Sequence, residues 1–209
     1  MDYSNEKKFD WGIPKIESEL LNFIFKKIKT KKSILTSLNN NVKTESLIFK
    51  TYGETYWIYT FDFIPWIKPN TSYKKYIVSL EDSYLINCIA NSTIFYIYYI
   101  LSTDCRNFTS ANLNDFPISL NELSNEIKKE LKIINSRLMI SFQENRIERY
   151  DKRVEGFLFE YKIKKSKSII DEIDTLLAQH YGFTDEELDF IINYDIKYRM
   201  GKELDNEEE

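Results

Sequence analysis

The chain has 209 residues, of which 43% are hydrophobic and 15% aromatic, and its formal net charge is -4. A chain of this length and apolar content can bury a core of its own, which excludes a disordered protein and favours one domain with or without a small appendage. With only 5 Gly and 4 Pro, it is also not a chain of long flexible loops.

Cysteine usage and the N-terminus indicate a compartment. Cys88 and Cys105 are the only two cysteines, and both lie in stretches that we expect in or near the core. This excludes a disulfide-stabilised scaffold and favours a reducing environment. The first residues contain no apolar signal-peptide segment, so we expect a cytoplasmic protein.

The negative charge is concentrated in an acidic tail, residues 202–209. Five of its side chains are acidic, and removing these five charges from -4 leaves +1 for the rest of the chain. Affinity for nucleic acid follows local lysine and arginine placement more than whole-chain charge. Basic runs in the near-neutral body are therefore either phosphate contacts or ordinary solvated surface.

Residues 1–41 are predicted to form an N-terminal arm and one amphipathic helix. Residues 1–13 are polar with scattered aromatics, and Pro14 stands near the predicted first turn. A lysine-rich run, residues 26–32, ends the helix, where it either stabilises the helix dipole or faces phosphate. The predicted apolar face consists of Ile16, Leu20, Leu21, Phe23, Ile24 and Ile28.

Residues 42–80 are predicted to form a small antiparallel sheet. Three runs rich in β-branched and aromatic residues, 46–50, 55–63 and 73–80, are separated by Gly53 and two prolines. Most of the aromatic side chains should belong to the core. The intervening lysines also make the sheet a possible platform for a nucleic-acid groove; these are Lys50, Lys68, Lys74 and Lys75.

Residues 84–101 are apolar on nearly all sides and are predicted to form one buried helix. A membrane span is not expected, because polar residues 87 and 91–93 interrupt the stretch. The polar loop 103–108 follows. Its Asp104 and Arg106 are expected either to pair with each other or to bind an external ligand.

Residues 120–149 are predicted to form one long helix, and residues 157–163 a short strand. The apolar side of that helix would consist of Leu123, Ile127, Leu131, Ile134, Leu138, Phe142 and Ile147.

The C-terminal third is predicted to be a helical hairpin. Apolar residues at three- and four-residue spacing between Ile169 and Leu177 give the first helix a buried face. Gly182 is suited to end that helix, and Thr184 with Glu187 forms a capping box for the next one. The second helix is predicted to continue through Leu188, Ile191, Ile192 and Ile196 to Gly201. The predicted fold class is α+β, with the small sheet, its flanking helices and this hairpin in one domain, residues 42–201.

The residues for most kinds of catalysis are missing. Two cysteines and His180, all far apart, match no zinc spacing, and a single histidine leaves little material for imidazole catalysis. No glycine-rich phosphate loop is present, so no cofactor is expected in this chain. One acidic set remains: Asp151, with Glu160 and Lys162 on a predicted strand, has the pattern of metal-dependent nucleases or simply of a solvated strand face.

Several blocks together resemble one family. They are Phe49-Lys50-Thr51-Tyr52-Gly53 with Tyr56-Trp57 and Phe61; Asn91-Ser92-Thr93-Ile94-Phe95-Tyr96 with Asp104-Cys105-Arg106 and Phe116-Pro117-Ile118; and, in the hairpin, Lys167-Ser168-Ile169-Ile170-Asp171-Glu172-Ile173-Asp174 and Tyr194-Asp195-Ile196-Lys197-Tyr198-Arg199-Met200-Gly201. In this order, over roughly residues 45–201, they resemble the C-terminal target-recognition (specificity) domain of adenine-specific DNA methyltransferases of type II and type IIG restriction-modification systems.

The resemblance covers only the recognition half of such enzymes. The Asn/Asp-Pro-Pro-Tyr/Phe motif and the methyl-donor loop are absent, and Glu54 stands where the family often has a second glycine. It therefore implies a DNA-binding domain whose catalytic methylase, with its S-adenosylmethionine, lies in another domain or subunit. The implied phosphate contacts are Lys74, Lys75, Lys164, Lys165 and Lys167, and the implied groove-reading or loop-orienting residues are Tyr52, Arg106 and Asn107.

Two other functions remain open at this point. One is a metal-dependent nuclease that uses Asp151, Glu160 and Lys162. The other is a structural domain that docks onto the methylase and never contacts DNA.

Overall fold

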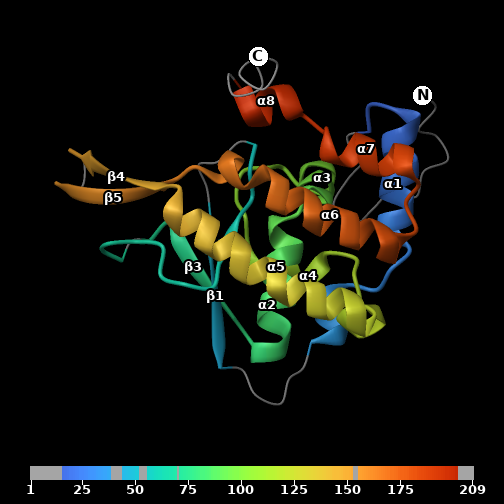
Figure 1. Cartoon of the computed structure of the whole chain (residues 1–209), viewed down its shortest axis with the longest axis horizontal. Coiled ribbons are helices and arrows are strands. Elements are labelled where there is room, and N and C mark those ends of the chain that lie inside the picture. Colours follow the sequence, from blue (N-terminus) through green and yellow to red (C-terminus); the bar gives the residue numbers. More distant parts are fainter. Residues whose placement is uncertain (1–15, 39–43, 52–55, 70, 153–154, 202–209) are drawn as a thin grey trace.

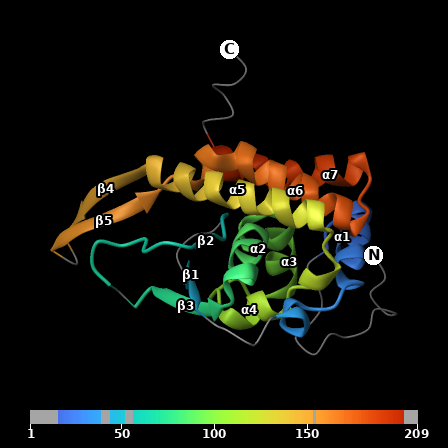
Figure 2. The same cartoon turned by 60° about the horizontal axis from the view of Figure 1, so that its bottom comes forward.

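The computed structural model describes residues 16–38, 44–51, 56–69, 71–152 and 155–201. A helical body packs beside a small sheet, and a two-stranded hairpin extends from one end (Figures 1 and 2). The α-helices are α1 (Glu19–Lys29), α2 (Leu80–Asn91), α3 (Thr93–Ser102), α4 (Ser110–Asp115), α5 (Asn125–Glu144), α6 (Lys167–Tyr181), α7 (Asp185–Ile192) and α8 (Ile196–Met200). The strands are β1 (Glu45–Lys50), β2 (Thr60–Phe61), β3 (Tyr73–Val78), β4 (Arg146–Asp151) and β5 (Gly156–Tyr161). The predicted α+β class with a small antiparallel sheet is confirmed.

The three-stranded sheet has the order β2-β1-β3, with both pairings antiparallel. Ile48 lies opposite Phe61 on one side and Lys75 on the other, and Phe49 lies opposite Thr60 and Lys74. Because side chains alternate along a strand, these two sets face opposite sides of the sheet. The predicted run 55–63 forms only the two-residue strand β2, so this part of the strand prediction was too long.

A buried polar network holds β2 against the helices. The Thr60 hydroxyl donates to Asn87 Oδ1 at 2.5 Å, and Asn91 Nδ2 donates to the Thr60 carbonyl at 3.1 Å. Asn87 Nδ2 in turn donates to Asn135 Oδ1 at 2.7 Å, and Asn135 Nδ2 to Asp62 Oδ2 at 2.8 Å. A strand of two residues has few ladder bonds, so these side chains supply most of its attachment.

The apolar stretch 84–101 is broken into two helices, which corrects the prediction of a single one. The break is at Ser92, where the chain is extended and the Ser92 hydroxyl accepts from the backbone N–H of Phe95. The two helices, α2 and α3, meet at 70°. Among the helices that the structure describes, none alone is long and apolar enough to cross a membrane, and only this bent pair reaches the length and composition together.

The long helix predicted over residues 120–149 is shorter at both ends. Ser124 caps α5 by accepting from the N–H of Ile127, and the helix ends at Glu144. From Arg146 the chain pairs with β5 instead, so Ile147 is half exposed on a strand and not on the apolar side of a helix. The helix ends early because the chain after Asn145 pairs with a segment ten residues further on. Helical spacing of apolar residues cannot reveal such strand pairing. The predicted strand at residues 157–163 forms as β5, but it ends at Tyr161, and Ile163 begins a short 3-10 turn.

The C-terminal helical hairpin forms as predicted in its first half. Gly182 adopts φ 67° at the end of α6, and Thr184 and Glu187 make the capping box that starts α7. The second helix then ends at Ile192. Asp195 adopts φ 53°, and a separate helix, α8, begins at Ile196, so the prediction of one continuous second helix was wrong.

Helix α1 belongs to the same core as the rest of the chain. Leu21, Ile24 and Ile28 are buried, whereas Phe23, which the spacing placed on the apolar face, is exposed. Lys27 Nζ donates to Glu187 Oε2 at 2.6 Å, so this lysine of the basic run serves packing. The predicted arm, Pro14 and the acidic tail lie outside the residues that the structure describes.

One buried carboxylate joins segments that are far apart in sequence. Asp174 on α6 is fully buried and accepts from the backbone N–H groups of Thr93 and Ile94, each at 3.1 Å, at the start of α3. Negative charge is favoured at a helix N-terminus, where the first N–H groups have no intrahelical partner. Burial raises the pKa of Asp174 to about 6, against these hydrogen bonds and the nearby charge of Arg199.

Arg199 on α8 completes this cluster. Its Nη1 donates to the Thr93 hydroxyl at 3.1 Å, and its guanidinium stacks on the Trp57 ring at 4.0 Å and near the Tyr96 ring at 5.0 Å. The Trp57 indole N–H donates to the Arg199 carbonyl at 3.2 Å. We call Trp57, Thr93, Tyr96, Asp174 and Arg199 the Asp174 cluster.

Replacing Asp174 should be strongly destabilising. Asp174→Ala would leave two buried N–H groups without their acceptor and the buried Arg199 guanidinium without a nearby opposite charge, so we expect the free energy of unfolding to fall by about 3 to 5 kcal/mol. Urea denaturation followed by circular dichroism measures this. The matched control is Glu172→Ala on the same helix, which breaks only a solvent-exposed pair with Arg137 and should cost less than about 1 kcal/mol. Equal losses for the two variants would contradict the assignment.

The Asp174 cluster should also make stability depend on pH. The pKa of Asp174 is higher in the folded than in the unfolded chain, so the folded state holds the proton more tightly between about pH 4 and pH 6. The stability that Asp174 contributes is therefore fully present below pH 4 and falls by roughly 3 kcal/mol as the pH rises through 6. Urea unfolding of wild type and Asp174→Asn across this range checks it. If the difference in unfolding free energy between wild type and Asp174→Asn does not change with pH, the assigned pKa shift is refuted.

Candidate nucleic-acid interface

The loop between α3 and α4 presents Arg106 at the end of β1. The Phe108 N–H donates to the Thr51 carbonyl at 2.9 Å, and the Phe108 ring packs against Phe49 at 5.0 Å. This fixes the loop on the sheet. The Arg106 side chain itself is 83% exposed, and its Nε lies 3.9 Å from Asp104. Such an exposed pair contributes little stability, so the arginine can exchange it for an external ligand.

A small hollow lies beneath this loop, and we call it the Arg106 hollow. With a volume of about 30 Å³, it is too small to enclose a nucleotide or a methyl-donor cofactor. The lining residues are Lys50, Thr51, Trp57, Ile58, Tyr59, Tyr99, Arg106 and Phe108. The cysteine of the loop, Cys105, is exposed, which corrects the expectation that both cysteines lie in or near the core, whereas Cys88 is buried.

A larger hollow lies where α5 passes into the β4–β5 hairpin, and we call it the basic hollow. It has a volume of about 260 Å³. Four of the seven lining side chains are cationic and one is acidic; the lining residues are Glu144, Asn145, Arg146, Ile147, Lys162, Lys164 and Lys165. An open site lined by several ammonium and guanidinium groups is suited to the oxygens of a phosphate.

Backbone and hydroxyl contacts hold the basic hollow in shape. The Lys162 N–H donates to the Asn145 carbonyl at 3.3 Å, which closes the base of the hairpin. The hydroxyls of Ser141 on α5 and Ser166 are 2.7 Å apart. Lys164 and Lys165 therefore stand on a short turn, residues 163–166, that is fastened to α5 at one end and to the hairpin at the other.

Glu160 links the two hollows. Its carboxylate accepts from Lys162 of the basic hollow. The pKa of Glu160 is lowered, first by that hydrogen bond and then by the charges of Lys162, Arg149 and Lys50. Lys50 lines the Arg106 hollow, so one cation from each hollow, Lys162 and Lys50, acts on this carboxylate. We call Arg106, Lys50, Lys162, Lys164, Lys165 and Arg146 the basic strip.

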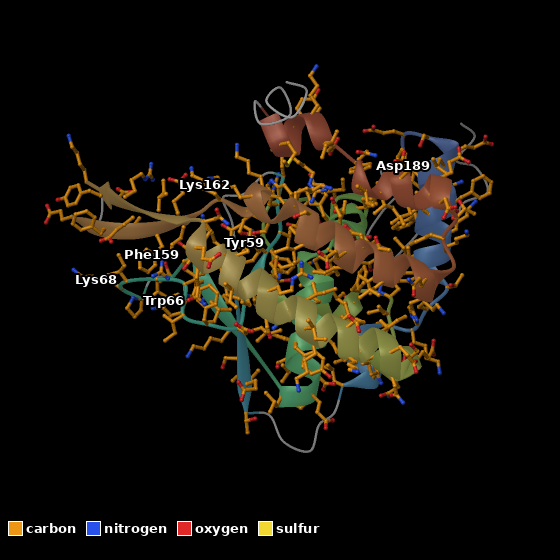
Figure 3. The ribbon with its side chains drawn as sticks, viewed as in Figure 1. Tyr59, Trp66, Lys68, Phe159, Lys162 and Asp189 are labelled. Carbon is orange, nitrogen blue, oxygen red and sulfur yellow. The ribbon has the colours of Figure 1, made fainter. Side chains whose placement is uncertain are left out.

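The hairpin next to the basic strip has an aromatic face. Tyr161 packs against Phe61 at 4.6 Å and Phe63 at 6.1 Å, and the Arg146 guanidinium lies over Phe159 at 4.2 Å. Figure 3 shows Phe159 and Lys162 at the same end of the molecule as Trp66 and Lys68, and Asp189 at the other end.

Five of the predicted DNA contacts are exposed or partly exposed near this strip. Lys164 and Lys165 belong to the basic hollow and Arg106 to the other hollow, and Asn107 is exposed in the same loop as Arg106. Lys75 is exposed on the face of the sheet that carries Ile48 and Lys50.

Three of the predicted contacts do not join the strip. Lys167 is largely buried, with 9% of its side chain exposed, and binds Asp171, so it stabilises α6 and is not available to phosphate. Lys74 is exposed but faces the side of the sheet opposite Lys50. Tyr52 lies outside the described residues.

The acidic set proposed for a nuclease is paired with cations. One guanidinium, that of Arg149, lies 3.9 Å from Asp151 and 3.7 Å from Glu160, so a cation of the chain already stands between the two carboxylates. Glu160 is bound to Lys162, and over the part of the chain that is described, no cluster of three or more His, Cys, Asp or Glu side chains could hold a metal.

The sequence interpretation missed Arg146. The helical spacing assigned Arg146 to the long helix. Residues 146–151 and 156–161 are, however, two strand-length runs on either side of a charged turn, and this pattern could have predicted a β-hairpin here.

Comparisons of the chain with protein-family models, curated proteins and solved structures found no match.

The contrast between Arg106 and Lys167 can be tested by stability. Arg106→Ala should leave the free energy of unfolding unchanged within about 0.5 kcal/mol, because the side chain is exposed. Lys167→Ala should lower it by about 1 to 3 kcal/mol, because Asp171 loses a charged hydrogen bond in a partly buried place. Urea denaturation of both variants is the measurement. A large loss for Arg106→Ala, or none for Lys167→Ala, would reverse these assignments.

Proposed function

We propose that this chain is the DNA target-recognition domain of an adenine-specific DNA methyltransferase or restriction-modification enzyme. It would supply sequence-specific binding of double-stranded DNA, while a methylase domain or subunit elsewhere binds S-adenosylmethionine and modifies the adenine. The observation that carries the proposal is the basic strip, which gathers cations from the sheet, the α3–α4 loop and the hairpin base around two hollows.

The basic strip supports binding to the phosphate backbone. Lys164 and Lys165 are held next to Arg146 and Lys162 at one hollow, and phosphate contacts by such side chains fix the register of a protein on a duplex. Each neutralised phosphate releases counterions, so the interaction should weaken as the salt concentration rises. A net charge of -4 does not oppose this, because the strip acts locally.

The α3–α4 loop supports a role in reading bases. Arg106 is exposed, and Asp104 Oδ1 accepts from its backbone N–H at 3.1 Å, which orders the loop, while the guanidinium makes only the long contact of 3.9 Å with Asp104. An arginine can donate two parallel hydrogen bonds to a guanine edge, and an asparagine such as Asn107 can donate one to adenine N7 and accept one from adenine N6. These two neighbouring side chains are therefore the base-reading candidates of the loop.

The contacts among the resembling blocks support treating them as one unit. Trp57 comes from the first block, Thr93 and Tyr96 from the second, and Asp174 and Arg199 from the C-terminal one, and all five form the Asp174 cluster. Side chains that meet in this way serve folding. The residues that carry the resemblance therefore indicate a shared scaffold, and the specificity belongs to the exposed loop and hairpin.

The proposal predicts salt-dependent binding that two lysines control. With fluorescence anisotropy on a labelled random-sequence duplex, the affinity should fall steeply as sodium chloride is raised. The double variant Lys164→Gln, Lys165→Gln should bind more weakly and reduce the log–log salt slope by about 2, because two phosphate contacts are lost.

The control removes the same charge elsewhere. Lys128 and Lys129 lie in the first turns of α5, at the end of that helix away from the hairpin (Figures 1 and 2), and their conversion to Gln should leave the slope unchanged. If the two double variants behave alike, the basic strip is not the interface. If wild type shows no salt-dependent binding, the proposal fails and a docking role without DNA contact is favoured.

A further inference from the structure

The β4–β5 hairpin extends beyond the body with an aromatic pair near its free end. Tyr150 and Phe157 are directly opposite each other, with ring centroids 5.4 Å apart, and are 53% and 52% exposed. At the other end of the hairpin, Arg146 is opposite Tyr161. The two positions are four residue steps apart along the strand, which corresponds to about 13 Å.

Contacts at its base hold the described part of the hairpin on the body. Tyr161 packs against Phe61 and Phe63, and Phe159 packs against the hydrophobic core. An isolated two-stranded hairpin is marginally stable in water, so this base must hold the projecting part. A cross-strand aromatic pair contributes only about 0.2 to 1 kcal/mol to a hairpin. The small stability that the pair adds to the hairpin therefore does not explain why two large aromatic rings are exposed.

Charge is distributed along the hairpin in a way that suits a groove. The cations Arg146, Lys164 and Lys165 are at the base. Arg149, on the shaft, lies 3.7 Å from Glu160 and 3.9 Å from Asp151, so its charge is offset locally. The described part of the hairpin therefore has a basic base, a shaft on which Arg149 is offset and Glu148 is exposed, and, next to the turn, the pair Tyr150 and Phe157, which we call the aromatic tip.

We propose that the β4–β5 hairpin enters the major groove of DNA, with Tyr150 and Phe157 against the bases and Lys164, Lys165 and Arg146 on phosphates at the groove edge. This rests on the proposed DNA-binding function and names the element that reads the sequence. The major groove is about 12 Å wide and 8.5 Å deep and admits a two-stranded ribbon. A tip about 13 Å beyond the basic base is long enough to reach the base edges while the base stays at the phosphates.

The dimensions favour DNA over a protein partner. A protein surface would cover the aromatic tip without requiring cations about 13 Å behind it. In a duplex, the phosphates lie at the edges of the groove and the base edges at its floor, so a ligand that contacts both needs two separated sets of side chains. Apolar contact with thymine methyl groups is one way in which aromatic side chains distinguish bases in this groove.

The test compares specificity with salt dependence. A preferred duplex is first obtained by selecting a random-sequence library on the wild-type chain, and its affinity is compared with that of a scrambled duplex. Tyr150→Val with Phe157→Val keeps β-branched strand residues, so the hairpin should persist by circular dichroism. We expect this variant to lose the preference by about tenfold or more with an unchanged salt slope.

Two further variants separate this inference from the function on which it rests. Lys164→Gln with Lys165→Gln should weaken both duplexes and retain the preference. Phe23→Val removes an equally exposed ring, at 56%, from α1 at the opposite end of the molecule, and should change neither quantity. If the lysine variant weakens binding but the valine variant keeps full preference, the hairpin proposal is overturned and DNA binding stands. If no duplex is selected, both are overturned.

A second measurement does not depend on removing the rings. Placing the photo-crosslinking residue p-benzoylphenylalanine at position 150 keeps an aromatic side chain there. Irradiation with the selected duplex should attach the chain to DNA, and the same residue at position 23 should not. Crosslinking from position 23 alone, or from neither position while the duplex is bound, would refute the placement of the hairpin.

Discussion

The fold depends on the burial of one carboxylate. Asp174 is fully buried on α6, yet it accepts from the first N–H groups of α3 and lies in a cluster with Arg199 of α8. A buried charge without such partners would cost several kcal/mol. The segments that meet there, the Trp57 loop, α3, α6 and α8, are therefore fixed relative to one another. The sheet end and the α3–α4 loop, which carry part of the basic strip, adjoin these fixed segments.

Features set by neighbouring residues were predictable from the sequence, and those set by distant ones were not. Gly182 and the Thr184–Glu187 capping box are local signals, and each has the predicted geometry. The break at Ser92 has a local part, the Ser92 cap, and a distant part, the Asp174 carboxylate about eighty residues away that accepts from the N–H groups of Thr93 and Ile94, and local spacing could not indicate the distant part. The end of α5 was missed for the same kind of reason, since β4 exists only by pairing with β5.

The candidate site also has one part that could be predicted from local sequence and another that depends on distant residues. The lysines at 164 and 165 could be identified from their run, but their relation to Arg146 appears only when the chain reverses at Asn145 and closes through the Lys162 N–H. Lys167 belongs to the same run, yet helical geometry turns it inward toward Asp171. The basic run thus contains surface lysines on the turn at residues 163–166 and a buried lysine at the start of α6. The sequence alone does not show where the turn ends and the helix begins.

The polar network beneath β2 has a fixed direction. Each donor points the same way, from the Thr60 hydroxyl through the carboxamides of Asn87 and Asn135 to the carboxylate of Asp62. Rotating either carboxamide would set two acceptors against each other, at the contact between Asn87 and Asn135 or at the contact between Asn135 and Asp62, so the groups polarise one another only in this order. Related chains should therefore change these four positions together or leave all of them unaltered, which makes the network a marker by which distant relatives could be recognised.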